Sequence, residues 1–171
     1  PDPEMDAIRA SFRCNGHLPG DPEGEPCDPT DKNDVYTEGV RMAEEYAMIH
    51  SKNPYFQKMF LFFHDERLAV SSSAASWCER YALVEYVEKV HKLAINGNYK
   101  SYMDDMNNDL LMHLAWLDGE DNHNYEPNEN WAREFWELGT VGPTSLDGNP
   151  VYSDLDIAQA ALAFTGNVID Y

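Results

Sequence analysis

The chain has 171 residues, of which 43% are hydrophobic and 12% aromatic, enough to build a folded domain with a real core. Its 31 acidic residues against 12 lysines and arginines give a formal net charge of −19, which excludes a nucleic-acid partner and disfavours an anionic membrane surface. Cations and basic partners remain compatible with this charge, and solubility alone also explains it. No apolar run approaches the length of a membrane span.

Residues 1–33 are predicted to form a non-helical arm, because proline, glycine and aspartate dominate from Leu18 to Asp31 without any period. Cys14 and Cys27 lie in this arm, and their separation of 13 residues is not a zinc-ligand spacing. We expect a disulfide between them, which would tie the arm down and place the protein in an oxidising compartment. Cys78 lies next to Trp77 on a helical pattern and is expected to be a buried free thiol.

The remainder of the chain, residues 34–171, is predicted to form one helical domain. Apolar residues recur at helical spacing in four stretches, which are residues 34–51, 53–63, 77–95 and 99–117. Asn53 is expected to cap the second stretch, with Pro54 in its first turn. A last helix is expected to start at Ser153 with a capping box and to end at Thr165-Gly166. No alternation typical of a strand reaches a convincing length. The predicted fold class is therefore all-α, an irregular multi-helix bundle with long loops.

The most informative segment is residues 127–140, which places amides, acids and one arginine beside large aromatic residues at the start of a helix. In a structural interpretation, Arg133 pairs with Glu129 or Glu137 at helical spacing, while Asn128 and Asn130 cap the loop and the first turn. Such a polar network fixes a packing arrangement without doing chemistry.

A functional interpretation of the same segment stays open. Glu134 and Glu137 are spaced as carboxylate ligands or as an acid/base pair on one helix face. His64 ends an apolar helix and would be the third catalytic group, with the neighbouring acids Asp65 and Glu66 to orient it. Acid/base work would require one carboxyl whose pKa is raised in a dry pocket. A lone histidine in such a place is more often a hydrogen-bonded structural residue.

The loop of residues 118–129 resembles a twelve-residue calcium loop in its oxygen side chains. Positions one, three, five, nine and twelve are Asp118, Glu120, Asn122, Glu126 and Glu129. However, His123 stands where the sharp turn of an EF-hand needs glycine. We therefore expect no true EF-hand, whereas a looser calcium site that uses some of these oxygens stays open. Calcium is the one cofactor that the sequence suggests.

Four ordered motifs lie between residues 53 and 171. The first, in residues 62–71, is similar to FWHxxFxxS, with Phe63 where tryptophan is usual. The others are a Leu-Asp pair, a segment similar to PNENxAREllELxTxG and one similar to YxxxDixxaArALTGW, at residues 117–118, 127–142 and 152–166. Together they resemble the bacterial family known as domain of unknown function 1800. Residues 1–33 fall outside this resemblance.

The resemblance implies an exported, mostly helical protein, extracellular or periplasmic, for which no activity is established. Family members tend to be encoded beside a secreted sulfatase-like family, so the implied partner is a sulfatase-like exported protein or another envelope or matrix protein. Members are usually longer than this chain, which we therefore expect to be a fragment of a longer protein.

Three hypotheses follow. The first is a structural or interaction component of the cell envelope or extracellular matrix. The second is a hydrolase-like or metal-dependent enzyme that acts on an extracellular polymer with His64, Glu134 and Glu137. The third is a calcium-stabilised scaffold.

Overall fold

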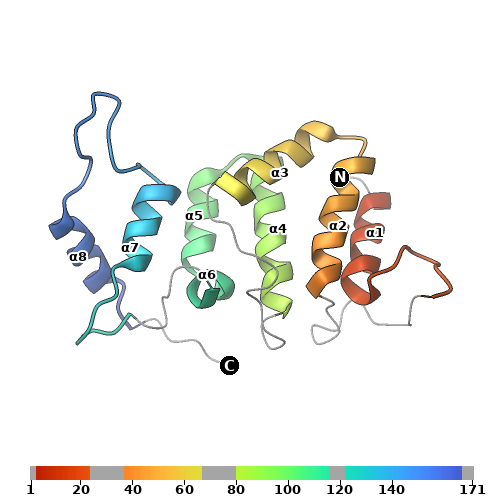
Figure 1. Cartoon of the computed structure of the whole chain (residues 1–171), viewed down its shortest axis with the longest axis horizontal. Helices are drawn as coiled ribbons and strands as arrows, with labels where there is room; N and C mark the ends of the chain where they lie inside the picture. Colours follow the sequence, from red (N-terminus) through yellow and green to blue (C-terminus); the bar gives the residue numbers. More distant parts are fainter. Residues whose placement is uncertain (1–2, 24–36, 67–79, 116–121, 167–171) are drawn as a thin grey trace. The chain divides into compact units, whose positions relative to one another are not determined.

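The computed structural model describes residues 3–23, 37–66, 80–115 and 122–166. Every regular element in those ranges is a helix, so the all-α prediction is confirmed (Figure 1). The chain divides into two compact units. Unit 1 comprises Pro1–Phe62 and Ser71–Gly97, and unit 2 comprises Phe63–Val70 and Asn98–Tyr171.

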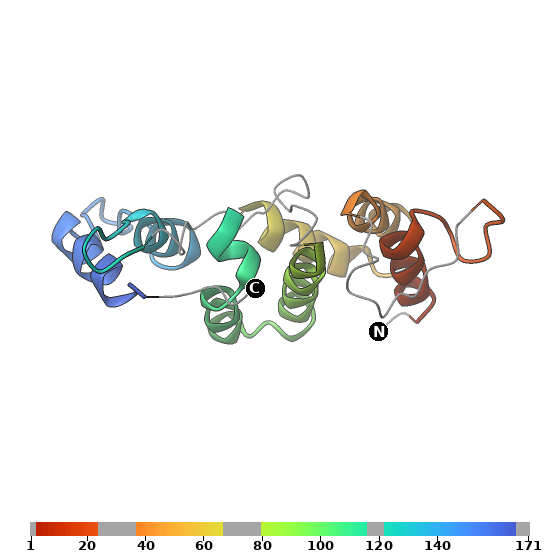
Figure 2. The ribbon, with the colours of Figure 1, turned by 90° about the horizontal axis from the view of Figure 1, so that it is seen from below.

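Unit 1 is a small helical assembly. Its helices are α1 (Pro3–Asn15), α2 (Thr37–His50), most of α3 (Pro54–Glu66) and α4 (Arg80–Asn96). α1 packs along α2, as Figures 1 and 2 both show, and α2 also contacts α4. Val40, Ala43 and Ala47 line the buried side of α2, and the two alanines, which are fully buried, allow close approach of the neighbouring backbone.

The presence of α1 shows that the prediction of a non-helical arm was wrong for Pro3–Asn15. Met5 and Phe12 are seven residues apart on one face of α1 and are both buried, which is the amphipathic pattern of a core-facing helix. Acids in the first turn and Arg13 in the last turn also suit the helix dipole. The helix was missed because the proline- and glycine-rich composition of the residues that follow it was taken to hold for all of residues 1–33.

The starts and ends of α3 and α4 follow the sequence closely. Asn53 Oδ1 accepts a hydrogen bond from Phe56 N at 3.1 Å, and Pro54 is the first helical residue, so the predicted cap and first turn are confirmed. α4 ends at Asn96, and Gly97 takes a φ of +65°, the left-handed conformation that favours glycine after a helix.

Unit 2 contains short helices joined by irregular connections. They are α5 (Tyr99–Asn107), α6 (Leu110–Ala115), α7 (Asn130–Glu134), the π-helix η5 (Phe135–Gly139) and α8 (Asp154–Ala163). The predicted capping box of the last helix is confirmed, because Ser153 Oγ accepts from Asp156 N while Asp156 Oδ2 accepts from Ser153 N. α8 ends before the predicted Thr165-Gly166, at Ala163.

The single helix predicted over residues 99–117 is interrupted after Asn107. Asp109 is buried and its Oδ1 accepts a hydrogen bond from Met112 N at 3.0 Å. A side chain that satisfies the backbone in this way starts a new helix and so competes with continuation of the first one. α5 and α6 are therefore two separate helices, although a single apolar pattern runs through both in the sequence.

The core of unit 2 joins α7 to α8 through aromatic contacts. The ring of Trp131, which is 1% exposed, lies 3.8 Å from that of Phe164 and 5.0 Å from that of Phe135. Ile157 and Ala161 of α8 are also fully buried. These contacts pack the segment of residues 127–140 against α8.

Some expectations concern residues outside the described ranges, which include Cys27, Cys78, Asp118, Glu120 and the boundary expected near residue 33. The disulfide between Cys14 and Cys27 therefore stays a prediction. Among the described helices, none is both long and apolar enough to cross a membrane.

Candidate functional site

Asn122 connects the loop before α7 to the end of α8. Its side chain is 1% exposed, and Nδ2 donates to the carbonyl oxygen of Ala161 at 2.8 Å, while Oδ1 accepts from Asn128 N at 2.9 Å. Asn128 continues the chain of contacts, because its Oδ1 accepts from Asn130 N at 2.8 Å. Two amides thus satisfy backbone groups at the start of α7 and on the last turn of α8.

Glu129 and Arg133 form the ion pair that the structural interpretation expected. Arg133 Nη2 lies 3.0 Å from Glu129 Oε2, one helical turn away. Both side chains are more than 40% exposed, so the pair contributes little to stability by itself. It spans the first turn of α7 on the surface of unit 2.

This geometry limits how the 118–129 loop could bind calcium. The buried amide of Asn122 is engaged by backbone groups, and Glu129 is paired with Arg133. Within the described residues, no group of three or more histidine, cysteine or acidic side chains is placed to hold a metal ion. Since Asp118 and Glu120 lie outside that part of the chain, a calcium site there stays a prediction.

Glu134 is an acidic residue of unit 2 whose pKa departs from its ordinary value. It is the last residue of α7, directly before the π-helix, a form that occurs often at functional sites. Partial burial and, second, the charge of Glu137 raise the pKa of Glu134, and the nearby Arg133 opposes them. The sequence hypothesis required a carboxyl shifted in this direction.

Tyr152 joins this site, although the sequence pattern did not single it out. Its ring meets that of Trp136 edge-on at 5.2 Å. Desolvation and then the charge of Glu137 raise the pKa of Tyr152, so the hydroxyl stays protonated as a hydrogen-bond donor. Glu134 at the end of α7, Glu137 in η5 and Tyr152 before α8 therefore influence one another electrostatically, and they are called the η5 cluster below.

His64 lies in the last turn of α3, and its Nε2 is 3.9 Å from Asp65 Oδ1. Asp65 was expected to orient it. The side chain of His64 is about a quarter exposed, at 26%. That His64 works together with Glu134 and Glu137 stays a prediction.

Unit 1 holds a buried ionic cluster that sequence reasoning missed. Glu44 lies at its centre, with Oε1 3.3 Å from Arg9 Nε and 3.6 Å from Arg13 Nη2, and with Oε2 2.9 Å from His91 Nε2. Burial is the largest influence and by itself would raise the pKa of Glu44, but the hydrogen bond from His91 and the charges of His91, Arg9 and Arg13 together lower it. The sequence offers one sign of this cluster, which is the charged Arg9 on the apolar face of α1. The sign is visible only once residues 3–15 are recognised as a helix.

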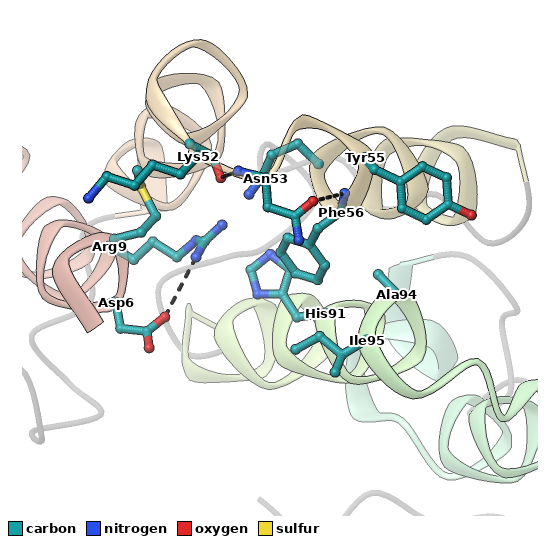
Figure 3. Close-up of a pocket in the computed structure, with 12 residues that line it drawn as sticks. Asp6, Arg9, Lys52, Asn53, Tyr55, Phe56, His91, Ala94 and Ile95 are labelled. Carbon is teal, nitrogen blue, oxygen red and sulfur yellow. Dashed lines mark hydrogen bonds and ion pairs between the residues drawn. The ribbon is translucent and has the colours of Figure 1, made fainter. Parts of the chain in front are cut away.

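A pocket of about 620 Å³ lies beside this cluster (Figure 3). α1 contributes Arg9, the start of α3 contributes Asn53 and Tyr55, and α4 contributes His91. In Figure 3, the guanidinium of Arg9 reaches toward the ring of His91, and Tyr55 stands at the side of the pocket. Gln57 also lines it; this side chain is only 4% exposed, and its Oε1 has no hydrogen-bond partner among the described residues.

Comparison with known families identifies the chain. It matches the model of the family described as "Protein of unknown function (DUF1800)" over residues 12–171 and therefore belongs to that family. The match begins within α1, so residues 12–33, which the four sequence motifs left out, are part of the family's region. No curated protein and no solved structure matches the chain.

Proposed function

We propose that this protein is an exported structural or interaction component of the cell envelope or extracellular matrix. The observation that carries the proposal is the structural role of residues 127–142, the segment that most closely resembles a motif of the family. The side-chain oxygen of Asn128 accepts a hydrogen bond from Asn130 N at the start of α7, and the side chain of Asn122, just before the segment, joins Asn128 N to the Ala161 carbonyl of α8. A segment whose side chains bind backbone groups in this way fixes the shape of the surface around it.

Unit 2 also presents apolar side chains suited to a protein partner. Leu155 and Leu162, seven residues apart on α8, are 65% and 49% exposed, although Ile157 and Ala161 already bury the opposite side of that helix. The connection from η5 to α8 adds exposed Val141 and Val151. A helix that is apolar on both sides is typical of one covered on both sides.

The partner that the family resemblance implies is a sulfatase-like exported protein. An interface centred on Leu155 and Leu162 would bury apolar area, so its affinity should depend only weakly on salt, in contrast to an interface formed by the −19 charge of the chain.

Isothermal titration of the purified chain with the sulfatase-like protein of the same organism tests the proposal. We expect binding that Leu155→Ser with Leu162→Ser weakens at least about tenfold, which corresponds to loss of about 1.4 kcal/mol of apolar contact. Leu18→Ser, at an exposed leucine of unit 1, is the matched control and should leave binding unchanged. Fractionation of the native cells should find the protein outside the cytoplasm. Exclusive recovery from the cytoplasm would refute the exported role.

The η5 cluster supports a second candidate, an enzyme that acts on an extracellular polymer. The raised pKa of Glu134 favours a protonated general acid, and Glu137 would then be the ionised partner. Release of new chain ends from envelope polysaccharide is the assay. Glu134→Gln should abolish the release while Glu129→Gln, at the paired surface acid, keeps it. Absence of release by the wild-type chain would remove this candidate.

A further inference from the structure

We propose that the pocket of unit 1 binds a neutral, hydroxyl-rich ligand, that is, a saccharide unit. The inference concerns a different unit from the proposed interaction surface and does not rest on it. Three properties of the pocket carry it: an amide without a partner, a balance of charge, and an exposed aromatic ring.

Gln57 sets the kind of group that the pocket accepts. A buried side-chain amide that makes no hydrogen bond is costly, and Gln57 lines the pocket with its Oε1 unpartnered among the described residues. An amide end both donates and accepts, so it is satisfied by a group that can do the same. A hydroxyl meets this requirement in either orientation of the amide, whereas a carboxylate only accepts and an ammonium only donates.

The charges around the pocket disfavour an anionic ligand. Arg9 is the buried cation of the pocket, but its Nε faces Glu44 at 3.3 Å and its Nη1 faces Asp6 at 3.7 Å. Lys52, at the rim, lies 3.2 Å from Glu4. Each cation therefore already has a carboxylate within ion-pair distance, and a carboxylate or phosphate ligand would have to compete with it, although Arg9 Nη2 has no hydrogen-bond partner among the described residues. A neutral ligand can still accept hydrogen bonds from the same guanidinium.

The arrangement of the polar groups favours a sugar ring over a peptide. Arg9, Gln57 and His91 come from three different helices, and Asn53 lies directly before one of them, so hydrogen bonds from these groups would point in several directions. The hydroxyls of a sugar also point outward in several directions, but a peptide bond offers one donor and one acceptor on opposite sides. Tyr55 lines the pocket and is 71% exposed, and its ring extends away from Arg9 and His91 (Figure 3), where it would pack on the C–H face of a sugar ring that reaches past the polar groups. A pocket of about 620 Å³ is within the usual size range of ligand sites.

The experiment uses the 171-residue chain with glucose, galactose, mannose and N-acetylglucosamine as separate probes in saturation-transfer NMR and titration calorimetry. We expect at least one sugar to bind, and Gln57→Leu to weaken it about tenfold, the effect of one lost buried hydrogen bond to a ligand. The same substitution should keep or raise the melting temperature, because it removes an unsatisfied amide.

Tyr55→Ala is a second variant at an exposed position and should weaken the same sugar severalfold without unfolding the chain. Tyr125→Ala, at the exposed tyrosine of unit 2, is its matched control and should bind as the wild type does. The proposal is overturned if none of the four sugars binds, if binding is indifferent to both pocket variants, or if acetate or N-acetylglycinamide binds more tightly than every sugar.

Discussion

The hydroxyl of Tyr99 donates a hydrogen bond to the carbonyl oxygen of Gly139 at 2.5 Å, across forty residues of sequence. The contact joins the first turn of α5 to the last residue of η5. Met103 also approaches Gly139 closely, because a Cβ atom built on Gly139 would lie 2.7 Å from Cε of Met103. A side chain at position 139 would therefore displace either the methionine or the end of the π-helix.

Tyr99→Phe should lower the free energy of unfolding by about 1 kcal/mol, because the Gly139 carbonyl loses its donor while the aromatic ring is kept. Gly139→Ala should lower it by about 1 kcal/mol, the low end of overpacking costs, because the atom that must move is the terminal methyl of the flexible Met103 side chain. Urea unfolding measures both. Tyr125→Phe, at an exposed ring, is the control and should be neutral. A neutral Gly139→Ala would show that Met103 moves aside freely.

Glu44→Ala should destabilise unit 1 by about 3–5 kcal/mol, since it leaves the buried guanidinium of Arg9 and its neighbour Arg13 without their shared carboxylate. Glu45→Ala, at an exposed acid one residue later, should change the stability little. Thermal unfolding of both variants, followed by circular dichroism, makes the comparison. Equal effects at the two positions would contradict a buried cluster.

The same carboxylate predicts a pH dependence. The pKa of Glu44 is lowered in the folded protein, so the stability it contributes is fully present above its unfolded pKa of ~4.3 and is lost as the pH falls toward the folded value. Urea unfolding between pH 7 and pH 3 should show this loss for the wild type. Glu44→Gln should lose less stability over the same interval. Parallel curves for the two proteins would show that Glu44 does not titrate in this way.

Asn122→Ala should cost about 2–3 kcal/mol of stability, because the Ala161 carbonyl and the Asn128 amide are each left without their partner. If the amide acts through these contacts alone, the loss should be the same with calcium and with a chelator present. Differential scanning calorimetry under both conditions measures it. A loss that appears only with calcium would instead place Asn122 among calcium ligands.

Ser153→Ala should remove the capping box of α8 and lower stability by about 1 kcal/mol. Ser101→Ala, in the first turns of α5, is the comparison, because alanine there favours the helix and should not destabilise. Chemical denaturation of the two variants provides the test. Similar losses would mean that the box contributes nothing beyond the serine itself.

Local signals predicted the parts of this fold that depend on neighbouring residues. The caps at Asn53 and Ser153 were visible because each needs a partner only three residues away. The ion pair of Glu129 with Arg133 was likewise one of the pairs expected at helical spacing. Such interactions repeat with fixed sequence spacing, so a single sequence is enough to indicate them.

The remaining features depend on long-range contacts that no spacing encodes. Glu44 meets His91 across 47 residues, and Asn122 meets Ala161 across 39. The break between α5 and α6 was missed because the apolar pattern continues through it, and only the burial of Asp109 explains it. The pocket of unit 1 was missed for the same reason, since three helices have to meet before it exists.

The π-helix has one more consequence. A turn closed by i→i+5 bonds contains one residue more than an α-helical turn, so η5 carries a residue that a regular continuation of α7 would not need. The wider turn also moves Glu137 away from the face that a regular 3.6-residue period would give it relative to Glu134. Glu137 is exposed, whereas Glu134 is partly buried. Deleting one residue from Phe135–Gly139 would let α7 continue regularly and would rotate everything that follows. Relatives of different length in this segment would therefore share the helix but present different side chains beside Glu134.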